Sequence, residues 1–255
     1  MFRTFLLLLG IFSATNNALA EWVAISESDA GVFYIKTESI RKSGSRVTMW
    51  ELADMASTVD SSTMSYRSYK LKTELDCKHD QSRTLSGVFY SDRMGNGEVV
   101  FQYSENEKGD WGSIIPDSVG QATFEYGCGI RRLPTIHKVK RNKLMRLMET
   151  RIGDSFVDVA DIDRSGGKAK VWKLYNLKSP MKHSELIDYL SMQSYVEFDC
   201  KRSKSRTLSS TGHSKEIGEG AVVFFNDFRD SAEWSNVDPD GSDRSVLEVA
   251  CGRRR

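Results

Sequence analysis

One thirteen-residue stretch occurs twice in this chain of 255 residues. It reads ELDCKHDQSRTLS from Glu74 and EFDCKRSKSRTLS from Glu197, a shift of 123 positions. The same shift places the Val-Val-Phe run at 99–101 onto the identical run at 222–224. Upstream the shift is 122, and the matches stay collinear over about a hundred residues, which indicates an internal duplication. A duplicated chain of this length predicts two small domains of one fold.

The cysteines follow the duplication. Cys77 and Cys128 are 51 positions apart, and so are Cys200 and Cys251. Four cysteines allow three pairings, and the duplication favours Cys77–Cys128 and Cys200–Cys251. In the chain-entropy model each bridge closes a loop of about 50 residues and stabilises its domain by about 4 kcal/mol. A metal site built from the four thiolates would need closely spaced cysteine pairs, so we predict two disulfides instead.

The first twenty residues predict an exported protein. They contain one cation (Arg3), an apolar run over 5–12, and the small residues Ala18 and Ala20. This pattern is typical of a cleaved signal peptide, and the apolar run is too short to cross the roughly 30 Å core of a bilayer. The remaining chain carries 35 Lys and Arg (36 minus Arg3) against 35 Asp and Glu. Balanced charge creates no overall field toward nucleic acid, so we expect no nucleic-acid partner. No later stretch is apolar enough to span a bilayer, so we expect no transmembrane segment in the mature chain.

Each repeat shows strand signals followed by one short helix. In the first repeat the strand runs are 22–26, 32–36, 46–52, 66–77, 83–90 and 98–104. The segment 117–128 predicts a helix with Asp117 or Ser118 as N-cap, and 240–251 is its counterpart. Because Cys77 lies on the apolar face of its strand, a cysteine in the last helical turn can reach it.

These elements predict an α+β fold of two tandem small domains. Each is expected to be an antiparallel sheet of about six strands with a C-terminal helix tethered by a disulfide. The predicted boundaries are a signal peptide at 1–20, a first domain at 21–132, a basic linker at 133–143 and a second domain at 144–255. We call the segments 21–132 and 144–255 the N-terminal and C-terminal repeats.

No catalytic constellation emerges from the motifs. Glu74 with Asp76, repeated as Glu197 with Asp199, share a strand face, whereas paired catalytic carboxylates of glycosidases flank a pocket. We therefore expect solvated acids. The four histidines have no metalloprotease or triad setting and do not align between the repeats: His79, His137, His183 and His213.

Two further motifs point to turns rather than ligands. Residues 94–97 (MGNG) lack the lysine of a phosphate-binding loop. The segment 236–243 (NVDPDGSD) partly matches a calcium loop but has Leu247 where the bidentate glutamate belongs. We accordingly predict no enzyme activity and no catalytic, cofactor or metal site.

Two features leave alternatives open. The segment 133–148 contains five Lys and Arg residues, which fits either a heparin-like or nucleic-acid patch or, as we favour, a solvated linker. The aromatic residues fit either core packing or a concave, helix-free part of the sheet that binds a partner; they are Trp22, Trp50, Tyr66, Tyr69, Trp111, Trp172, Tyr189, Tyr195 and Trp234.

The ordered words EW, FYIKTESI, MWEL, YRS, ELDC, RTLS, MGNGEVV and IIPDSVGQATFEYGCG span the N-terminal repeat and end at Cys128. In this order and spacing the repeat resembles the surface-adhesin protein E family. The resemblance implies a six-stranded antiparallel sheet with one disulfide-tethered helix. The C-terminal repeat lacks the opening tryptophan and has 241–243 (GSD) in place of 118–120 (SVG), so it looks like a diverged second copy.

The resemblance also implies exposure at the surface of Gram-negative bacteria and binding of host matrix or plasma proteins. We therefore expect an exported, non-enzymatic binding protein of the periplasm or outer cell surface, with extracellular-matrix or plasma proteins as partners. The alternative is a periplasmic protein that binds a small ligand or haem in an aromatic groove between the repeats. The sequence assigns no ligand-binding residue.

Overall fold

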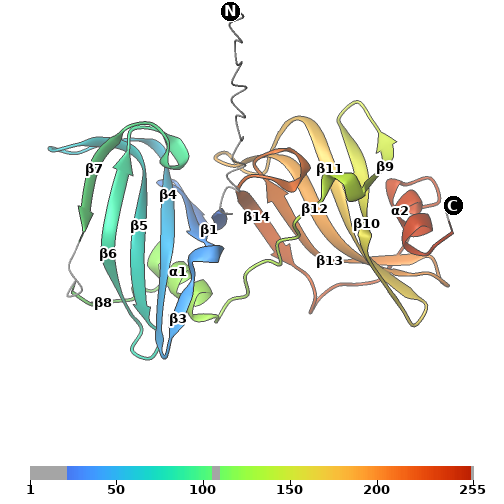
Figure 1. Cartoon of the computed structure of the whole chain (residues 1–255), viewed down its shortest axis with the longest axis horizontal. Helices are drawn as coiled ribbons and strands as arrows, with labels where there is room; N and C mark the ends of the chain where they lie inside the picture. The colour runs from blue at the N-terminus through green and yellow to red at the C-terminus, as the bar shows by residue number, and fades with distance from the viewer. Residues whose placement is uncertain (1–21, 105–109, 254–255) are drawn as a thin grey trace, which may run out of the picture.

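The protein is a long, twisted β-sheet with one short helix packed on each half (Figure 1). The computed structural model describes residues 22–104 and 110–253, so the predicted signal peptide lies outside it. The strands are β1 (Trp22–Ser28), β2 (Gly31–Lys36), β3 (Arg41–Ser43), β4 (Arg46–Asp60), β5 (Ser65–Asp76), β6 (Gln81–Tyr90), β7 (Val99–Ser104), β8 (Gly112–Ser113), β9 (Leu144–Glu149), β10 (Gly153–Ser165), β11 (Lys168–Lys182), β12 (Asp188–Asp199), β13 (Lys204–His213), β14 (Val222–Asp227) and β15 (Ser235–Asn236). The helices are α1 (Val119–Cys128) and α2 (Ser242–Ala250), with 3-10 turns η1 (Thr37–Ser39), η2 (Arg93–Gly95), η3 (Arg141–Lys143) and η4 (Glu216–Gly218).

The two repeats share one sheet. The strand order is β7-β6-β5-β4-β2-β1-β14-β13-β12-β11-β10-β9, to which each repeat contributes six consecutive strands. The prediction of two separate sheets is therefore wrong. Neighbouring strands within each repeat run antiparallel, but β1 and β14 pair in parallel, with Val23 opposite Val222. The alternating pattern of a strand indicates which of its residues face the core but not which strand lies beside it, so the sequence did not reveal this pairing.

An apolar cluster seals the contact between β1 and β14. From the N-terminal repeat, Tyr34 and Leu52 are direct cross-strand partners and both are buried. They pack with Ile187, Ala221 and Val223 from the C-terminal repeat. At the rim the Ser184 hydroxyl donates to the Glu27 carboxylate (2.6 Å). We call this contact the internal joint; its apolar burial gives the short strand pairing its stability.

The helices are pinned as the sequence predicts. The Ser118 side chain caps α1 by accepting from the Gln121 amide (3.2 Å). A ten-residue helix is marginal alone, but the Cys77–Cys128 disulfide ties its last turn to the end of β5. Cys200–Cys251 does the same for α2. Both predicted bridges are present.

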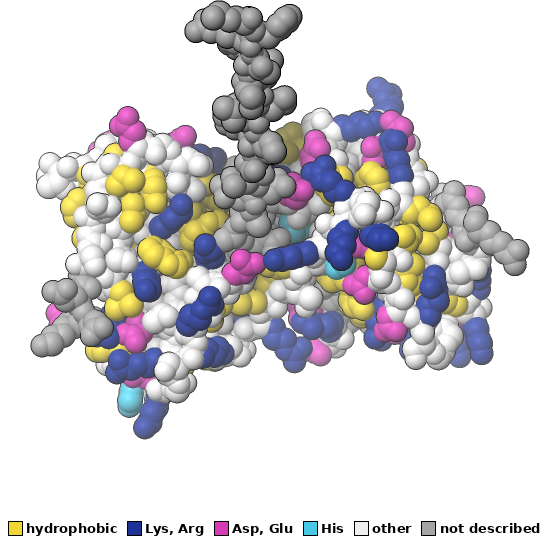
Figure 2. All heavy atoms as spheres, in the orientation of Figure 1, with side chains coloured by type: hydrophobic (Ala, Val, Ile, Leu, Met, Phe, Trp, Pro, Cys, Tyr) yellow, Lys and Arg dark blue, Asp and Glu magenta, His cyan; other side chains and the backbone are white. Residues whose placement is uncertain are grey.

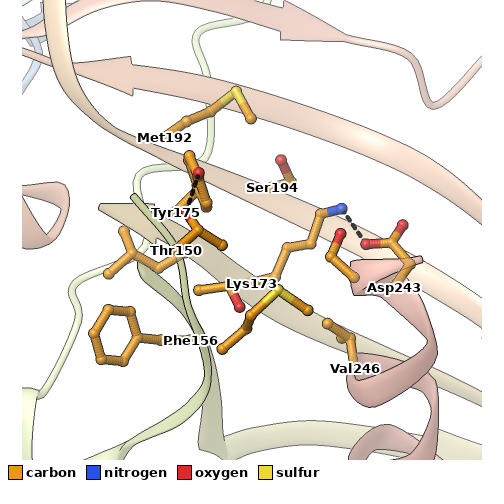
Figure 3. A pocket seen from close by; sticks show the side chains of 12 residues that line it. Thr150, Phe156, Lys173, Tyr175, Met192, Ser194, Asp243 and Val246 are labelled. Atoms are coloured by element: carbon orange, nitrogen blue, oxygen red, sulfur yellow. Dashed lines mark hydrogen bonds and ion pairs between the residues drawn. The ribbon is translucent and has the colours of Figure 1, made fainter. Parts of the chain in front are cut away.

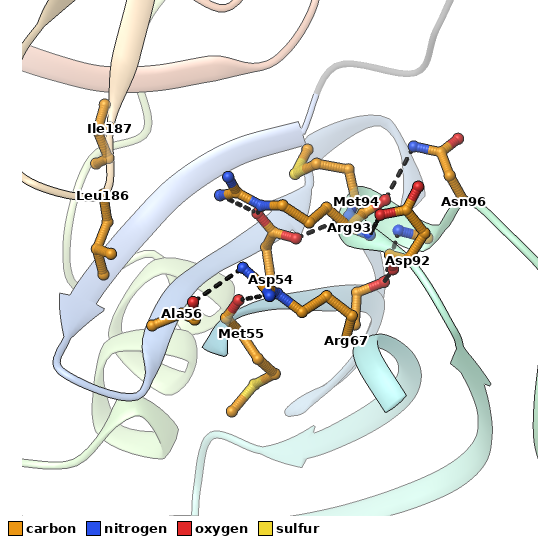
Figure 4. A network of polar contacts seen from close by, with 12 residues as sticks. Asp54, Met55, Ala56, Arg67, Asp92, Arg93, Met94, Asn96, Leu186 and Ile187 are labelled. Atoms are coloured by element: carbon orange, nitrogen blue, oxygen red, sulfur yellow. Dashed lines mark hydrogen bonds and ion pairs between the residues drawn. The ribbon is translucent and has the colours of Figure 1, made fainter. Parts of the chain in front are cut away.

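Each repeat anchors the turn between its last two strands by the same two contacts. The buried Ser68 hydroxyl donates to the Asp92 carbonyl and accepts from the Gly95 amide, and Ser191 makes the equivalent pair of bonds in the C-terminal repeat. The buried Asp54 carboxylate accepts from the Met94 amide at 2.8 Å (Figure 4). Asn176 holds the equivalent amide at 2.7 Å, so the position requires a hydrogen-bond acceptor rather than a charge.

The buried His213 makes stability depend on pH. Its side chain is fully buried at the end of β13, next to Val222 of the internal joint. Its Nε2 bonds to the Thr211 hydroxyl (3.0 Å), whereas Nδ1 has no hydrogen-bond partner. Burial lowers the pKa of His213 to about 4, well below the value of about 6.5 expected in the unfolded chain.

Protonation therefore favours the unfolded state. The free energy of unfolding should be unaffected by His213 above pH 6.5 and fall by roughly 3 kcal/mol between pH 6.5 and 4. His213→Phe should remove this loss, as urea unfolding at successive pH values measures. Carboxylates titrate in both proteins, so the difference between the two curves isolates the histidine. Parallel curves through this window would contradict the assignment.

Candidate binding surfaces

Two rows of side chains form an aromatic face on the N-terminal repeat. Cross-strand pairing aligns Ala53, Tyr69, Phe89 and Phe101 in one row and Glu51, Leu71, Gly87 and Tyr103 in the next. Directly opposite residues of an antiparallel pair share a face. The resulting aromatic patch consists of Tyr66, Tyr69, Phe89, Phe101 and Tyr103, with neighbouring ring centroids 5.0–6.5 Å apart.

The aromatic patch lies on the helix side of the sheet, beyond the part that α1 covers. Thr123 of α1 donates to the Glu51 carboxylate (3.2 Å), which places the helix over the inner end of the second row. The rings further out are half-buried, and Phe101 on the outermost strand is 45% exposed. Burial raises the pKa of Tyr69 to about 12, with Glu51 adding to the shift. Tyr69 therefore stays neutral and offers both an apolar ring and a hydroxyl to a partner.

The C-terminal repeat keeps aromatic rings at only two of the five equivalent positions, Tyr189 and Phe224, and has a pocket on the same side of the sheet, beside α2. The rows equivalent to those above read Tyr175, Met192, Gly212 and Phe224, and Lys173, Ser194, Ser210 and Asn226. A cavity of about 300 Å³ opens beside the N-terminus of α2 (Figure 3). It is lined by Met148, Thr150, Ser155, Phe156, Lys173, Leu174, Tyr175, Met192, Ser194, Ser242, Asp243 and Val246.

Two serines make room in this pocket. Ser155 and Ser194 occupy the positions that Phe33 and Leu71 hold in the N-terminal repeat. Both replacements remove large apolar side chains from the helix side of the sheet. The Ser155 hydroxyl oxygen is buried and makes no hydrogen bond with any described residue. A buried hydroxyl without a partner is costly, so it offers a binding contact to a molecule in the pocket.

A charged pair stands at one wall of the pocket. Lys173 Nζ lies 2.8 Å from Asp243 Oδ1, at the first turn of α2. The equivalent positions of the N-terminal repeat hold Glu51 and Gly120, and burial raises the pKa of Glu51 above its usual range. The two repeats thus place different polar groups at the same point of one fold: a buried carboxyl group in one and an ion pair in the other. The remaining walls are mainly apolar, which suits a compact amphipathic ligand.

The linker between the repeats packs more closely than predicted. His137 stacks on Trp172 with a centroid distance of 4.8 Å, and its Nε2 lies 2.9 Å from Asp158 Oδ2. Lys138 and Arg141 are paired with Glu38 and Glu219. On the face shown in Figure 2, basic and acidic side chains are interspersed. The side chains of Lys138 and Arg141 are exposed, as expected for a solvated linker. The expectation is wrong for His137, which packs on Trp172.

The repeated carboxylates are structural and not solvated. Glu197 is buried, and its carboxylate accepts from Arg206 Nε at 2.7 Å; Glu74 pairs with Arg83 at the same distance. In each repeat a tryptophan covers the guanidinium: Trp234 lies 4.7 Å from Arg206 and Trp111 lies 4.6 Å from Arg83. The prediction of solvated acids is wrong because the arginine and tryptophan, distant in sequence, close over them.

The other motifs gain no ligand role. Among residues 22–104 and 110–253, no three His, Cys, Asp or Glu side chains are grouped to hold a metal ion. In the calcium-like segment, Asp238 accepts from the Asp240 amide and Asp243 pairs with Lys173. Residues 94–97 form the turn held by Asp54. No helix in the described part of the chain is long and apolar enough to cross a membrane.

The pocket was missed from the sequence, although a signal for it existed. Aligning the repeats pairs Phe33 with Ser155 and Leu71 with Ser194. Large-to-small changes at two positions on one strand face indicate lost volume. That these positions are adjacent follows only from the strand pairing.

A family model described as surface-adhesin protein E matches residues 22–129 and again residues 144–252. The chain belongs to the surface-adhesin protein E family. The two matches correspond to the two halves of the sheet. No curated protein matches the chain.

Solved structures of Haemophilus influenzae protein E resemble parts of this family member. The structure of crystal form II of that protein E aligns with 44% of this chain and 89% of the protein E chain, with 16% sequence identity and a TM-score of 0.34. Protein E from non-typeable Haemophilus influenzae covers 45% of this chain and 79% of its own, with 16% identity and a TM-score of 0.33.

Proposed function

We propose that this protein is an exported, non-enzymatic binding protein whose N-terminal repeat contacts extracellular-matrix or plasma proteins. Membership of a surface-adhesin family supports the class of function, and the aromatic patch supports the surface. Half-buried aromatic rings that are held rigidly by a sheet are favourable anchors for protein partners. The patch is the observation on which the proposal rests.

The Phe101 ring should contribute strongly to partner binding. Phe101→Ser removes the outermost ring of the aromatic patch and should weaken binding about tenfold or more, the loss expected when an anchor is truncated. Binding is measured by biolayer interferometry against a panel of purified extracellular-matrix and plasma proteins. Phe228→Ser is the matched control, because Phe228 is 37% exposed and lies outside the patch. Equal binding by both variants would remove the patch from the proposal.

We further propose that residues 1–20 are removed as a signal peptide and that 21–132, the linker 133–143 and 144–255 form the mature protein. The protein is then exposed on the outer surface of a Gram-negative cell. Antibody labelling of intact cells should match labelling after lysis. Labelling only after lysis would place the protein in the periplasm and favour the second function below.

The pocket of the C-terminal repeat favours a second candidate, a periplasmic carrier of a compact amphipathic molecule. Its volume of about 300 Å³ lies at the lower end of small-molecule sites. The apolar part of the ligand meets Met192 and Val246. Its polar end reaches the Ser155 hydroxyl and the Lys173 ammonium. This second candidate function uses the pocket of the C-terminal repeat. It does not use the aromatic groove between the repeats that the sequence led us to expect for a small ligand or haem.

Filling the pocket should abolish ligand binding without unfolding the protein. Ser155→Phe with Ser194→Leu installs the two residues that the N-terminal repeat holds at these positions. Titration with octanoate, an apolar chain with one carboxylate, should shift pocket resonances in the NMR spectrum of the wild type but not of this variant. Ser165→Leu, at an exposed site on β10, is the control. A haem titration followed at the Soret band tests the larger ligand. Shifts that persist in the filled variant would exclude the pocket.

A further inference from the structure

We propose that copies of this protein associate end to end, with β9 of one copy pairing in parallel with β7 of the next. The internal joint provides the template. Its two strands, β1 and β14, pair with Val23 opposite Val222. The repeat shifts place β1 onto β9 and β14 onto β7, so Val23 corresponds to Met145 and Val222 to Val99. The two strands that pair inside the chain are thus each present a second time.

Those second copies are the two outermost strands of the sheet that the described residues form. β7 and β9 end the strand order at opposite ends of the molecule (Figure 1). Along β7 the three residues 99–101 are all exposed and apolar, and Val99 is 54% exposed; on β9, Met145 is 43% exposed. Apolar side chains on an unpaired edge form a template for another strand. Figure 2 shows hydrophobic side chains over the strands at the β7 end.

Side chains around the two edges fit the same arrangement. In the internal joint, Ala24 and Ala221 belong to the apolar cluster. Their equivalents are Arg146 on β9 and the exposed Glu98 beside β7. Two small apolar residues are thus replaced by opposite charges on one face of the new joint, where Glu98 is two residues along its strand from the residue opposite Arg146. Such complementarity gives register and partner selection.

The hairpin that covers the internal joint also has an equivalent in the N-terminal repeat. Ile187 of the β11–β12 hairpin packs into the internal joint. Its equivalent on the β4–β5 hairpin is Met64, which is positioned to cover β9 and β10 of the next copy. Arg146 already contacts Glu149 and Asp154 within its own chain, so the face is more polar than the internal joint. The end-to-end contact is therefore weaker and depends on concentration.

The contact joins two different surfaces, so it does not close on itself. A heterologous contact whose rotation does not complete a ring gives an open series of copies. The weight-average mass in sedimentation experiments should rise continuously with protein concentration and not stop at a dimer. A constant monomer mass at all concentrations would overturn the proposal.

Cysteine trapping tests the strand register. Met145→Cys and Val99→Cys are made in separate chains, mixed, and oxidised mildly. The mixture should give one cross-linked two-chain species, and neither variant alone should do so. Phe228→Cys, exposed and outside both edge strands, replaces Met145→Cys as the control and should not cross-link. Cross-linking of Val99→Cys with itself would indicate a symmetric β7–β7 contact and overturn the proposal.

Charge reversal tests the pairing of Glu98 with Arg146. Glu98→Arg should raise the concentration at half-association about tenfold, because two cations then meet at the joint. Adding Arg146→Glu in the same chain should restore association. Circular dichroism checks that both variants keep the fold. Equal association of the single variant and the wild type would contradict the assigned register.

Discussion

The parallel pairing of β1 with β14 determines the shape of the molecule. A single registered pair, Val23 with Val222, is a small contact, and the apolar cluster around Tyr34, Leu52 and Ile187 stabilises it. Because the cluster lies on the side of the sheet away from α1, β2 is buried on both faces. The two repeats, each partly covered by one helix, thereby form one continuous sheet whose outermost described strands are β7 and β9.

Duplication inside one sheet let the two copies diverge in their exposed faces while they kept the same supports. The disulfides, the serine anchors at Ser68 and Ser191 and the carboxylate–arginine–tryptophan groups recur in both repeats. The helix side of the sheet does not recur. One repeat has an aromatic patch on this side and the other has a serine-lined pocket beside its helix, so the supports are structural and the variable face is where binding is expected.

The polar groups at equivalent positions differ between the repeats. Glu51 accepts a hydrogen bond from Thr123 and burial raises its pKa, whereas Lys173 forms an ion pair with Asp243. A ligand suited to one site meets different polar groups at the other, which disfavours a common ligand. Likewise the internal joint is apolar where the free edges carry Glu98 and Arg146. The protein thus holds its own halves together tightly and contacts other copies weakly.

The sequence by itself determined the duplication, the two disulfides, the six main strand segments of the N-terminal repeat and the family, because these depend on local pattern and spacing. The sequence left Asp117 and Ser118 as candidate N-caps of α1. In the structure it is the Ser118 side chain that accepts the hydrogen bond from the Gln121 amide. Only the tertiary structure decided that β1 and β14 join the sheets, that Glu197 is buried and paired with Arg206, and that Ser155 and Ser194 open a pocket. These features depend on which residues, distant in the sequence, become neighbours in the fold. The alternation of apolar and polar residues along a strand indicates which side of the strand is buried, but it does not indicate which strand pairs with it.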